Sequence, residues 1–348
     1  MKNKVFTAGL ALTVLTVFFA SCENPAAQAE DYGSTGKFVA IASGSGDTAW
    51  SEDGKTWNSG GRLPADIDPE NGLRIGVTWI GIAYGRGKLA AVSYDSFDDI
   101  KAAWSADGLA WTEADLPEVE DVPVVANLQD VAYGNGKFVA VASTSAGNNR
   151  AAYSADGGST WTASSSLPSG DWYGVAYGNG KFVAVDGSSG KKTAASADGA
   201  AWTVGGSLPT VTGYWSAVVY GNGKFIAFST VGDTVYSTDD GETWSGKESG
   251  LPAGIRKAVY GGNRFAAVCG GNSDSNKAAW STDGVSWTEV TLPATTGWQD
   301  AAYGKGVFVA VAEDTAAWSE DGADWTAATL PPLQQGASWA AVTFIQAY

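Results

Sequence analysis

Seven aspartates along this chain each stand in the same short sequence, Ser-x-Asp-Gly-x-x-Trp, with one extra residue before the glycine in two copies. Seven such carboxylates could bind calcium or act in acid–base catalysis. An aspartate in a turn can instead accept hydrogen bonds from its own backbone, and glycine tolerates the left-handed conformation that such a turn needs. We therefore interpret all seven as a repeated structural turn. They are Asp53, Asp107, Asp156, Asp198, Asp239, Asp283 and Asp321.

A second group of acidic and aromatic residues lies in segments that differ from one copy of a repeat to the next. Carboxylates beside aromatic rings would suit a cation or a basic partner, and solvated acids on an acidic protein are the alternative explanation. No calcium-binding loop is recognisable among them, so the sequence predicts no metal site and no cofactor. These candidate ligand-binding residues, which we call the acidic rim, are Asp66, Asp68, Glu70, Arg74, Tyr94, Asp95, Phe97, Asp98, Asp99, Glu118, Glu120 and Asp121.

The composition narrows the range of partners. The chain carries 37 acidic and 21 basic residues, for a formal net charge of −16, and it contains no histidine. A surface of this sign repels phosphate backbones, so we expect no nucleic acid partner, and a protein or glycan partner should be neutral or cationic. Without histidine the chain lacks the usual proton shuttle near neutral pH and the commonest metal ligand. We expect a monomer that is not an enzyme.

The first residues resemble a bacterial export signal. Lys2 and Lys4 precede an apolar run at residues 5–19, which is long enough for a signal peptide but short for a membrane span. The run ends at Phe-Ala-Ser-Cys, which is similar to a lipobox with Phe19 in place of the usual aliphatic residue, so Cys22 would be lipidated. Cleavage after Ala29, where small residues flank the site, is the alternative.

This interpretation divides the chain into a signal peptide with lipobox at residues 1–22, a tether at residues 23–31 and a repeat domain at residues 32–348. It predicts an exported lipoprotein of the bacterial cell envelope, facing the periplasm or the cell surface, that touches the membrane only through its lipid anchor. Cys269 is the one other cysteine, and its apolar neighbours predict a buried small side chain. With Cys22 acylated, no disulfide can form.

The turns belong to a longer repeat. Phrases close to Trp-x-x-Val-Ala-Tyr-Gly-Asn-Gly-Lys-Phe-Val-Ala-Val precede them, and successive turn aspartates are 38 to 54 residues apart. This period is typical of a four-stranded propeller blade. The Asn-Gly dipeptide supplies the positive φ angles of a tight hairpin between the first two strands. In one copy we expect the four strands at residues 172–177, 181–185, 193–196 and from Trp202.

The two ends of the repeat domain are expected to meet. The first copy has Gly-Lys-Phe-Val-Ala-Ile at residues 36–41 but lacks the Trp-x-x-Val-Ala that precedes this phrase elsewhere. The missing segment stands near the other terminus, at residues 339–344. A C-terminal strand that completes the first sheet would close a ring and remove its exposed edges. We therefore predict an all-β fold, a seven-bladed β-propeller of four-stranded antiparallel blades, closed by the C-terminal strand completing blade 1.

The turn sequence resembles the Asp box of the bacterial neuraminidase repeat (BNR) family, and the copies at residues 154–161 and 237–244 match it best. The resemblance extends from about residue 32 to the end of the chain. It implies a sialidase-like β-propeller in which the boxes lie at the periphery, away from any active site. Because unrelated functions share this fold, the resemblance leaves the function open.

The strand order predicts two unlike faces. If A to D denote the strands of a blade from the axis outward, the A–B and C–D turns share one face, which we call the turn face. The B–C and D–A loops share the other, which we call the variable-loop face. The turns hardly differ among the copies, whereas the loops differ widely in length. We expect function on the variable-loop face, because loops can vary there without harm to the scaffold.

Three functions remain open from the sequence. A non-catalytic propeller would bind or scaffold a protein or glycan partner through its variable-loop face. A sialidase-like glycoside hydrolase, which the resemblance implies as an alternative, would hold the substrate carboxylate with three arginines. A membrane-complex assembly factor, like other propellers with this repeat, is the third possibility.

The arginines argue against the sialidase hypothesis. Residues 73–76, Leu-Arg-Ile-Gly, are only weakly similar to that family's Phe-Arg-Ile-Pro motif, with glycine in place of the proline. We place two of the six arginines in A–B turns, on the face away from an active site, and the other four in loops. The two turn arginines are Arg86 and Arg264, and the four loop arginines are Arg62, Arg74, Arg150 and Arg256.

Overall fold

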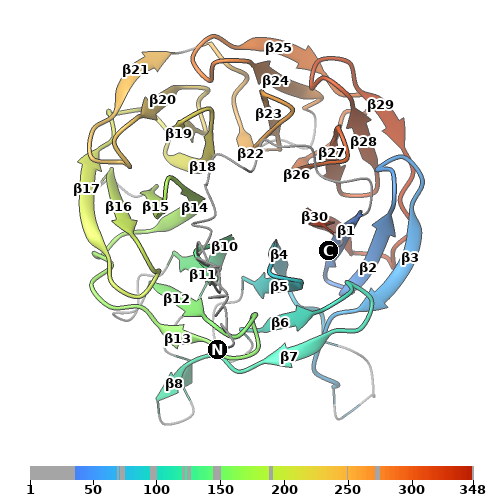
Figure 1. The fold of residues 1–348 in the computed structure, drawn as a ribbon. Helices are drawn as coiled ribbons and strands as arrows, with labels where there is room; N and C mark the ends of the chain where they lie inside the picture. Colours follow the sequence, from blue (N-terminus) through green and yellow to red (C-terminus); the bar gives the residue numbers. More distant parts are fainter. Residues whose placement is uncertain are drawn as a thin grey trace, which may run out of the picture.

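The computed structural model describes residues 36–68, 70, 75–94, 100–119, 122–123, 127–143, 150–187, 191–248, 250–270 and 275–346. The predicted signal peptide and tether, with Cys22, lie outside these residues. Every regular element within them is a β-strand, and they contain no helix that could cross a membrane. Seven four-stranded antiparallel sheets form a ring about a common axis (Figure 1). The chain is a seven-bladed β-propeller, as its repeat predicts.

Each blade runs from an innermost strand A to an outermost strand D. Blade 1 consists of β30 (Ser338–Gln346), β1 (Gly36–Ser43), β2 (Asp47–Ser51) and β3 (Asn58–Arg62). Blade 2 consists of β4 (Trp79–Gly85), β5 (Lys88–Ser93), β6 (Ala102–Ser105) and β7 (Thr112–Ala114). A short hairpin of β8 (Glu118–Val119) and β9 (Val122–Pro123) precedes blade 3, which consists of β10 (Leu128–Gly134), β11 (Lys137–Ala142), β12 (Ala151–Ser154) and β13 (Thr162–Ala163).

The other four blades follow in chain order. Blade 4 consists of β14 (Trp172–Gly178), β15 (Lys181–Asp186), β16 (Lys192–Ser196) and β17 (Thr203–Ser207). Blade 5 consists of β18 (Trp215–Gly221), β19 (Lys224–Ser229), β20 (Thr234–Ser237) and β21 (Ser245–Glu248). Blade 6 consists of β22 (Ile255–Gly261), β23 (Arg264–Cys269), β24 (Lys277–Ser281) and β25 (Thr288–Thr291). Blade 7 consists of β26 (Trp298–Gly304), β27 (Val307–Ala312), β28 (Ala316–Ser319) and β29 (Thr326–Ala328).

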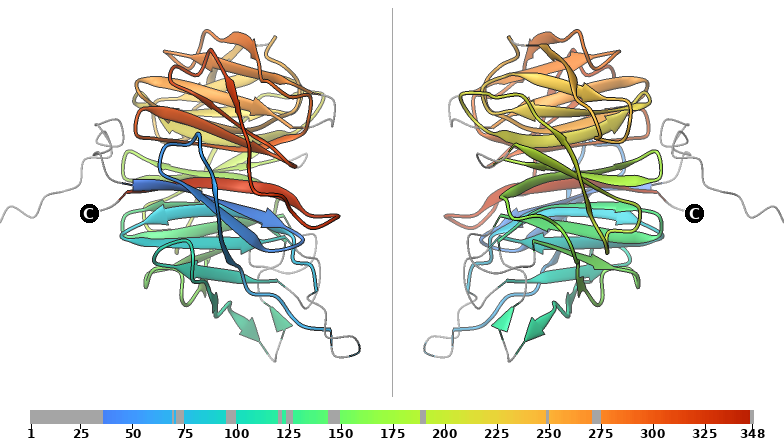
Figure 2. Two further views of the ribbon diagram at one scale, coloured as in Figure 1. Left: turned by 90° about the vertical axis from the view of Figure 1, so that its right-hand side faces the viewer. Right: turned by 90° about the vertical axis from the view of Figure 1, so that its left-hand side faces the viewer.

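Blade 1 is assembled from both ends of the repeat domain. β30 pairs antiparallel with β1, so that Phe344 stands opposite Phe38 and Trp339 opposite Ala42. The two phenylalanine rings meet edge to face, with their centroids 5.0 Å apart. This pairing confirms the predicted closure. It also places Gly36 beside the C-terminal end of β30 on the turn face, whereas the described parts of the first D–A loop, residues 63–68 and 75–78, lie toward the opposite face (Figure 2).

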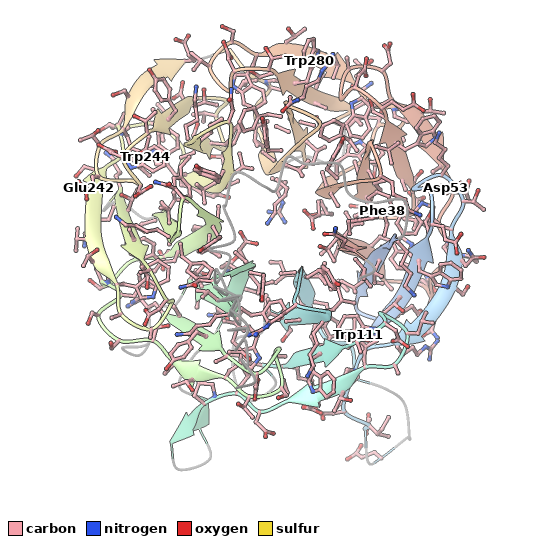
Figure 3. All side chains as sticks on the ribbon, in the orientation of Figure 1. Phe38, Asp53, Trp111, Glu242, Trp244 and Trp280 are labelled. Atoms are coloured by element: carbon pink, nitrogen blue, oxygen red, sulfur yellow. The ribbon has the colours of Figure 1, made fainter. Side chains whose placement is uncertain are left out.

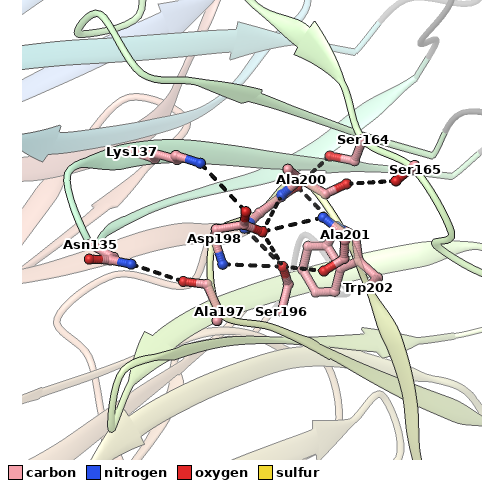
Figure 4. A network of polar contacts seen from close by, with 11 residues as sticks. Asn135, Lys137, Ser164, Ser165, Ser196, Ala197, Asp198, Ala200, Ala201 and Trp202 are labelled. Atoms are coloured by element: carbon pink, nitrogen blue, oxygen red, sulfur yellow. Dashed lines mark hydrogen bonds and ion pairs between the residues drawn. The ribbon is translucent and has the colours of Figure 1, made fainter.

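Lysines at the start of the B strands, directly after the A–B turns, reach the C–D turn of the next blade. Lys88 of blade 2 donates from Nζ to the backbone carbonyl of Asp156 in blade 3, at 3.3 Å. Lys137 of blade 3 pairs with Asp198 of blade 4, with 3.8 Å between Nζ and Oδ2 (Figure 4). The A–B and C–D turns therefore share one face, as the strand order predicts.

The seven turn aspartates make the same local contacts. In the first turn, Asp53 Oδ1 accepts the backbone N–H groups of Lys55 and Thr56, both at 2.8 Å. Ser51 Oγ accepts that of Gly54 at 2.8 Å, and Gly54 has a left-handed φ of 73°. Partial burial raises the pKa of Asp53, but these hydrogen bonds outweigh it and hold the pKa below its ordinary value. Asp53 lies near the outer edge of the ring (Figure 3), and its carboxylate holds the backbone of its own turn.

Close contacts beside the axis and buried apolar clusters join neighbouring blades. A Cβ atom on Gly178 would lie 2.0 Å from the ring of Tyr220 in the next blade, so no larger residue fits there. The clusters between sheets draw their residues from two adjacent blades each. Cys269 is fully buried in one of them, and burial raises the pKa of its thiol to about 12. It packs as a small apolar side chain, as its neighbours in sequence predict.

We expect Phe344→Ala to lower the free energy of unfolding by about 3–5 kcal/mol, because it removes a buried ring from the closing strand. Urea unfolding followed by tryptophan fluorescence measures this loss. The matched control is Val204→Ala, since Val204 is 65% exposed and its truncation should change stability by less than about 0.5 kcal/mol. Equal effects of the two substitutions would contradict the role given to β30.

Candidate functional site

Part of the predicted acidic rim is a salt-bridge cluster. Lys101 Nζ lies 3.0 Å from Asp66 Oδ1 and 3.0 Å from Glu113 Oε1, and the lysine is 7% exposed. Burial lowers the pKa of Lys101, but the two carboxylates outweigh it and raise the pKa, so the lysine stays charged. Asp66 therefore has a cationic partner within the chain itself.

The other rim residues are described only in part. Asp68 Oδ1 accepts the backbone N–H of Glu70 at 2.8 Å, Tyr94 is 39% exposed, and Glu118 lies in β8. The described residues hold no group of three or more acidic, histidine or cysteine side chains placed to bind a metal ion. The rim as a whole stays a prediction. The rim residues outside the described ranges are Arg74, Asp95, Phe97, Asp98, Asp99, Glu120 and Asp121.

The innermost strands differ between blades at one position that the sequence analysis missed. This position lies two residues after the Trp that opens each repeat, or after the Leu or Ile that replaces it. Four blades carry Gly or Ala there, and three carry a charged residue. Alignment of the seven copies against one another would have shown this difference. The residues, in blade order from 1 to 7, are Ala341, Gly81, Asp130, Gly174, Ala217, Lys257 and Asp300.

Lys257 of blade 6 reaches across the axis to Asp130 of blade 3, with 2.7 Å between Nζ and Oδ1. No two blades of a seven-bladed ring are farther apart. Asp130 also accepts the backbone N–H of Val175 in blade 4 at 3.1 Å, and Asp300 accepts that of Val342 in blade 1 at 2.9 Å. Asp130, Lys257 and Asp300, which we call the axial cluster, thus connect both opposite and adjacent blades.

Burial governs the charges of the axial cluster. Asp130 and Asp300 are both less than one-tenth exposed. Burial raises the pKa of Asp300 to about 6, although Lys257 and two backbone N–H groups oppose the rise. Burial lowers the pKa of Lys257, but the carboxylates of Asp130 and Asp300 outweigh it and raise the pKa, so Lys257 stays charged. Lys257 therefore pairs directly with Asp130 and also lies within electrostatic range of Asp300.

Near the propeller axis, the variable-loop face carries aromatic side chains at blades 4 and 5 and polar side chains at blades 6 and 7. The rings of Tyr173 in blade 4 and Tyr214, just ahead of blade 5, lie 5.3 Å apart at an angle of 32°. Across the axis, Arg256 of blade 6 donates to Gln299 Oε1 of blade 7 at 3.2 Å. The innermost strands begin at this face. Tyr173, Arg256 and Gln299 are each the second residue of such a strand, and Tyr214 directly precedes one. We call Tyr173 and Tyr214 the tyrosine pair.

Most of the exposed large apolar side chains in the described ranges lie in loops of the variable-loop face. Of the seven that the described ranges contain, only Leu109 and Val204 lie elsewhere, in a C–D turn and an outermost strand. The five in B–C and D–A loops are Ile67, Ile75, Tyr94, Tyr214 and Val231.

The described arginines are dispersed. Arg62 lies in strand β3 rather than in a loop, and it pairs with Asp47 at 2.6 Å. Arg256 also lies in a strand, β22, beside the axis. Both were assigned to loops because their local sequence carries no strand pattern of its own. Arg150 donates to the backbone carbonyl of Gly170 at 2.8 Å. These arginines belong to blades 1, 6 and 3, so they do not form one clamp.

Comparison with known proteins supports the fold and goes no further. No protein-family model matches the sequence, and no curated protein matches it. The structure titled "YCF48 bound to D1 peptide" superposes with a TM-score of 0.55 at 14% identity, over 81% of this chain and 86% of that one. YCF48 from Cyanidioschyzon merolae gives 0.51 at 15% identity, over 72% and 85%. The computationally designed Ika8 protein gives 0.50 at 10%, over 84% and 83%.

The raised pKa of Asp300 predicts how stability depends on pH. A group whose pKa is higher in the folded state stabilises the protein at low pH, and this contribution is lost as pH rises through about 6. Asp300→Asn removes it. Between about pH 4 and pH 7 we therefore expect the wild-type free energy of unfolding to fall relative to that of the variant, by up to about 3 kcal/mol.

Urea unfolding at a series of pH values measures this difference. The comparison variant is Asp239→Asn, because the pKa of Asp239 is lowered by hydrogen bonds from Thr243. Its contribution has the opposite sign and is lost as pH falls below about 4. If wild type and Asp300→Asn showed the same pH dependence, Asp300 would not titrate in this range.

Proposed function

We propose that this chain is a non-catalytic binding propeller of the bacterial cell envelope, which holds a protein or glycan partner on its variable-loop face. The observation that carries the proposal is the contrast between the two faces. The turn face is uniform and its lysines are engaged by the chain's own turns, as Lys88 and Lys137 show. The variable-loop face carries the exposed apolar residues, the tyrosine pair and the loops that differ between blades.

A protein or peptide partner is the form of the proposal that we favour. YCF48, which is similar to this chain in fold, has been captured with a D1 peptide. The mixture of exposed tyrosines with Arg256 and Gln299 provides apolar area together with hydrogen-bonding groups, which suits a peptide chain. A scaffold or assembly role for a membrane complex is a special case of the same activity.

We further propose that the chain belongs to the Asp-box class of repeats and is anchored by a lipid on Cys22. The seven turns support the first point, because each pairs a serine and an aspartate with the backbone of its own turn. The position of Gly36 bears on the second. The tether would join the propeller on the turn face, so the variable-loop face would point away from the membrane.

A sialidase-like glycoside hydrolase is the alternative function. The dispersal of Arg62, Arg150 and Arg256 over three blades weighs against it, since a carboxylate clamp needs arginines held together. Turnover of a fluorogenic sialoside by the purified protein, abolished in Arg74→Ala, would favour this alternative over the binding function.

For the anchor, we expect Cys22→Ser to move the protein from the membrane fraction to the soluble fraction, because the lipobox would no longer hold a thiol for acylation. Fractionation with detergent-phase partition of both forms measures the change. The control is Cys269→Ser. Because Cys269 is buried, this substitution should leave the distribution between the two fractions unchanged. Equal partition of wild type and Cys22→Ser would remove the lipid anchor from the proposal.

For the binding face, we expect Val231→Asp and Ile67→Asp to reduce recovery of an envelope partner in pull-downs by about tenfold. A carboxylate placed within an apolar contact must be desolvated on binding, which costs affinity. Leu109→Asp is the matched control, because Leu109 is nearly as exposed as Val231 but lies on the turn face. Loss of the partner with Leu109→Asp alone would place binding on the wrong face and contradict the proposal.

A further inference from the structure

We propose that the tyrosine pair, with the neighbouring Asp171, receives a lysine or arginine side chain of the partner. This inference rests on the proposed function and names the chemistry that its partner must present. The partner segment is expected to be cationic. Anionic and neutral segments are the alternatives that the experiment below distinguishes.

The tyrosine pair presents an aromatic surface to solvent. Its rings lie 5.3 Å apart at 32°, Tyr214 is 43% exposed and Tyr173 is half-buried. Asp186 Oδ1 accepts the backbone N–H of Asp171 at 3.0 Å, which fixes the segment that leads into Tyr173. The pair is therefore held in place before any partner arrives.

The electrostatic surroundings of the pair are negative. Burial raises the pKa of Tyr173, and the nearby charge of Asp171 raises it further, with smaller contributions from Tyr214, Tyr94 and Asp186. Acids that oppose a negative charge on this ring would favour a positive charge beside it. Aromatic faces attract cations through their quadrupole, so ring and carboxylate favour the same kind of ligand.

Elsewhere the chain covers its own aromatic rings with cations. Six rings on the turn face have a lysine or arginine over them, as where Lys55 lies 3.8 Å from the ring centre of Trp318 and Lys88 lies 4.1 Å from that of Trp104. Among the residues that the structure places, no cation lies over Tyr173 or Tyr214. A partner would supply here the cation that the chain supplies on its other face.

The two lysines of blade 4 that are nearest in sequence to the tyrosine pair donate hydrogen bonds to other groups of the chain. Lys191 donates to Thr210 Oγ1 at 2.8 Å, and Lys192 donates to the backbone carbonyl of Ser169 at 3.3 Å. Arg256 lies across the axis and is bound to Gln299. A partner cation would therefore settle on the side of blades 4 and 5, where the acids are, and the net charge of −16 would draw it in.

The test uses the full chain in mild detergent with 3-fluorotyrosine incorporated, titrated with a capped Gly-Arg-Gly-Arg-Gly peptide and its citrulline analogue. Citrulline keeps the shape of arginine without the charge. We expect the arginine peptide to shift the fluorine resonances of Tyr173 and Tyr214, and the citrulline peptide to bind about tenfold more weakly. Tyr214→Leu and Asp171→Asn should each weaken the arginine peptide about fivefold, in line with a cation–π contact beside a carboxylate.

The matched control is Tyr236→Leu, because that ring already lies under Lys224 on the turn face. Equal affinity of wild type, Tyr214→Leu and Asp171→Asn for the arginine peptide would show general attraction to an acidic protein and overturn the inference. A preference for the citrulline peptide or for a glutamate peptide would overturn it as well. If the inference failed while Val231→Asp still reduced partner recovery as expected, the proposed function would stand with a partner of different chemistry.

Discussion

The pairing of β30 with β1 is the contact on which the rest of the structure depends. A blade with two apolar faces needs a neighbour on each side, and only a closed ring gives every blade both neighbours. Closure joins Phe344 to Phe38 and covers the edge of β1, which would otherwise be the innermost strand of blade 1. It also fixes which turns lie on each face. The axial cluster exists because closure directs seven innermost strands toward one axis.

Stability and function are placed on different parts of this ring. The repeated contacts, namely the serine–aspartate turns, the lysines that reach the next blade and the glycines that admit a tyrosine, all join a residue to its own turn or to an adjacent blade. The axial cluster is the exception, because Lys257 joins blades 3 and 6. It lies one residue further along the strands than Tyr173, Arg256 and Gln299. It therefore supports, at a fixed separation, the two sides of the surface where we place the partner.

The sequence predicts the scaffold well, because each blade repeats the same local rules. The Asp-Gly turns, the Asn-Gly hairpins and the missing first strand at residues 339–344 are sufficient for the blade count, the closure and the two faces. The axial cluster was not predicted, since Asp130 and Lys257 are 127 residues apart and meet only when the ring closes. Arg62 and Arg256 were misplaced in loops because glycine-rich and charged segments become strands by pairing with a neighbour rather than by their own propensity. The acidic rim stays a prediction, since most of its residues lie outside the described ranges.

Site-specific photocrosslinking in the native host tests the central claim, that the partner is held on the variable-loop face beside the axis. One photoreactive residue would replace Ser216, near the start of β18, and another would replace Asn222, in the A–B turn that follows the same strand. Ser216 is the second residue of β18 and Asn222 directly follows its other end, so the two positions sample the two faces of the same blade. The account predicts a discrete crosslinked product from position 216 and none from position 222. Crosslinks from position 222 alone, or from neither position, would contradict it.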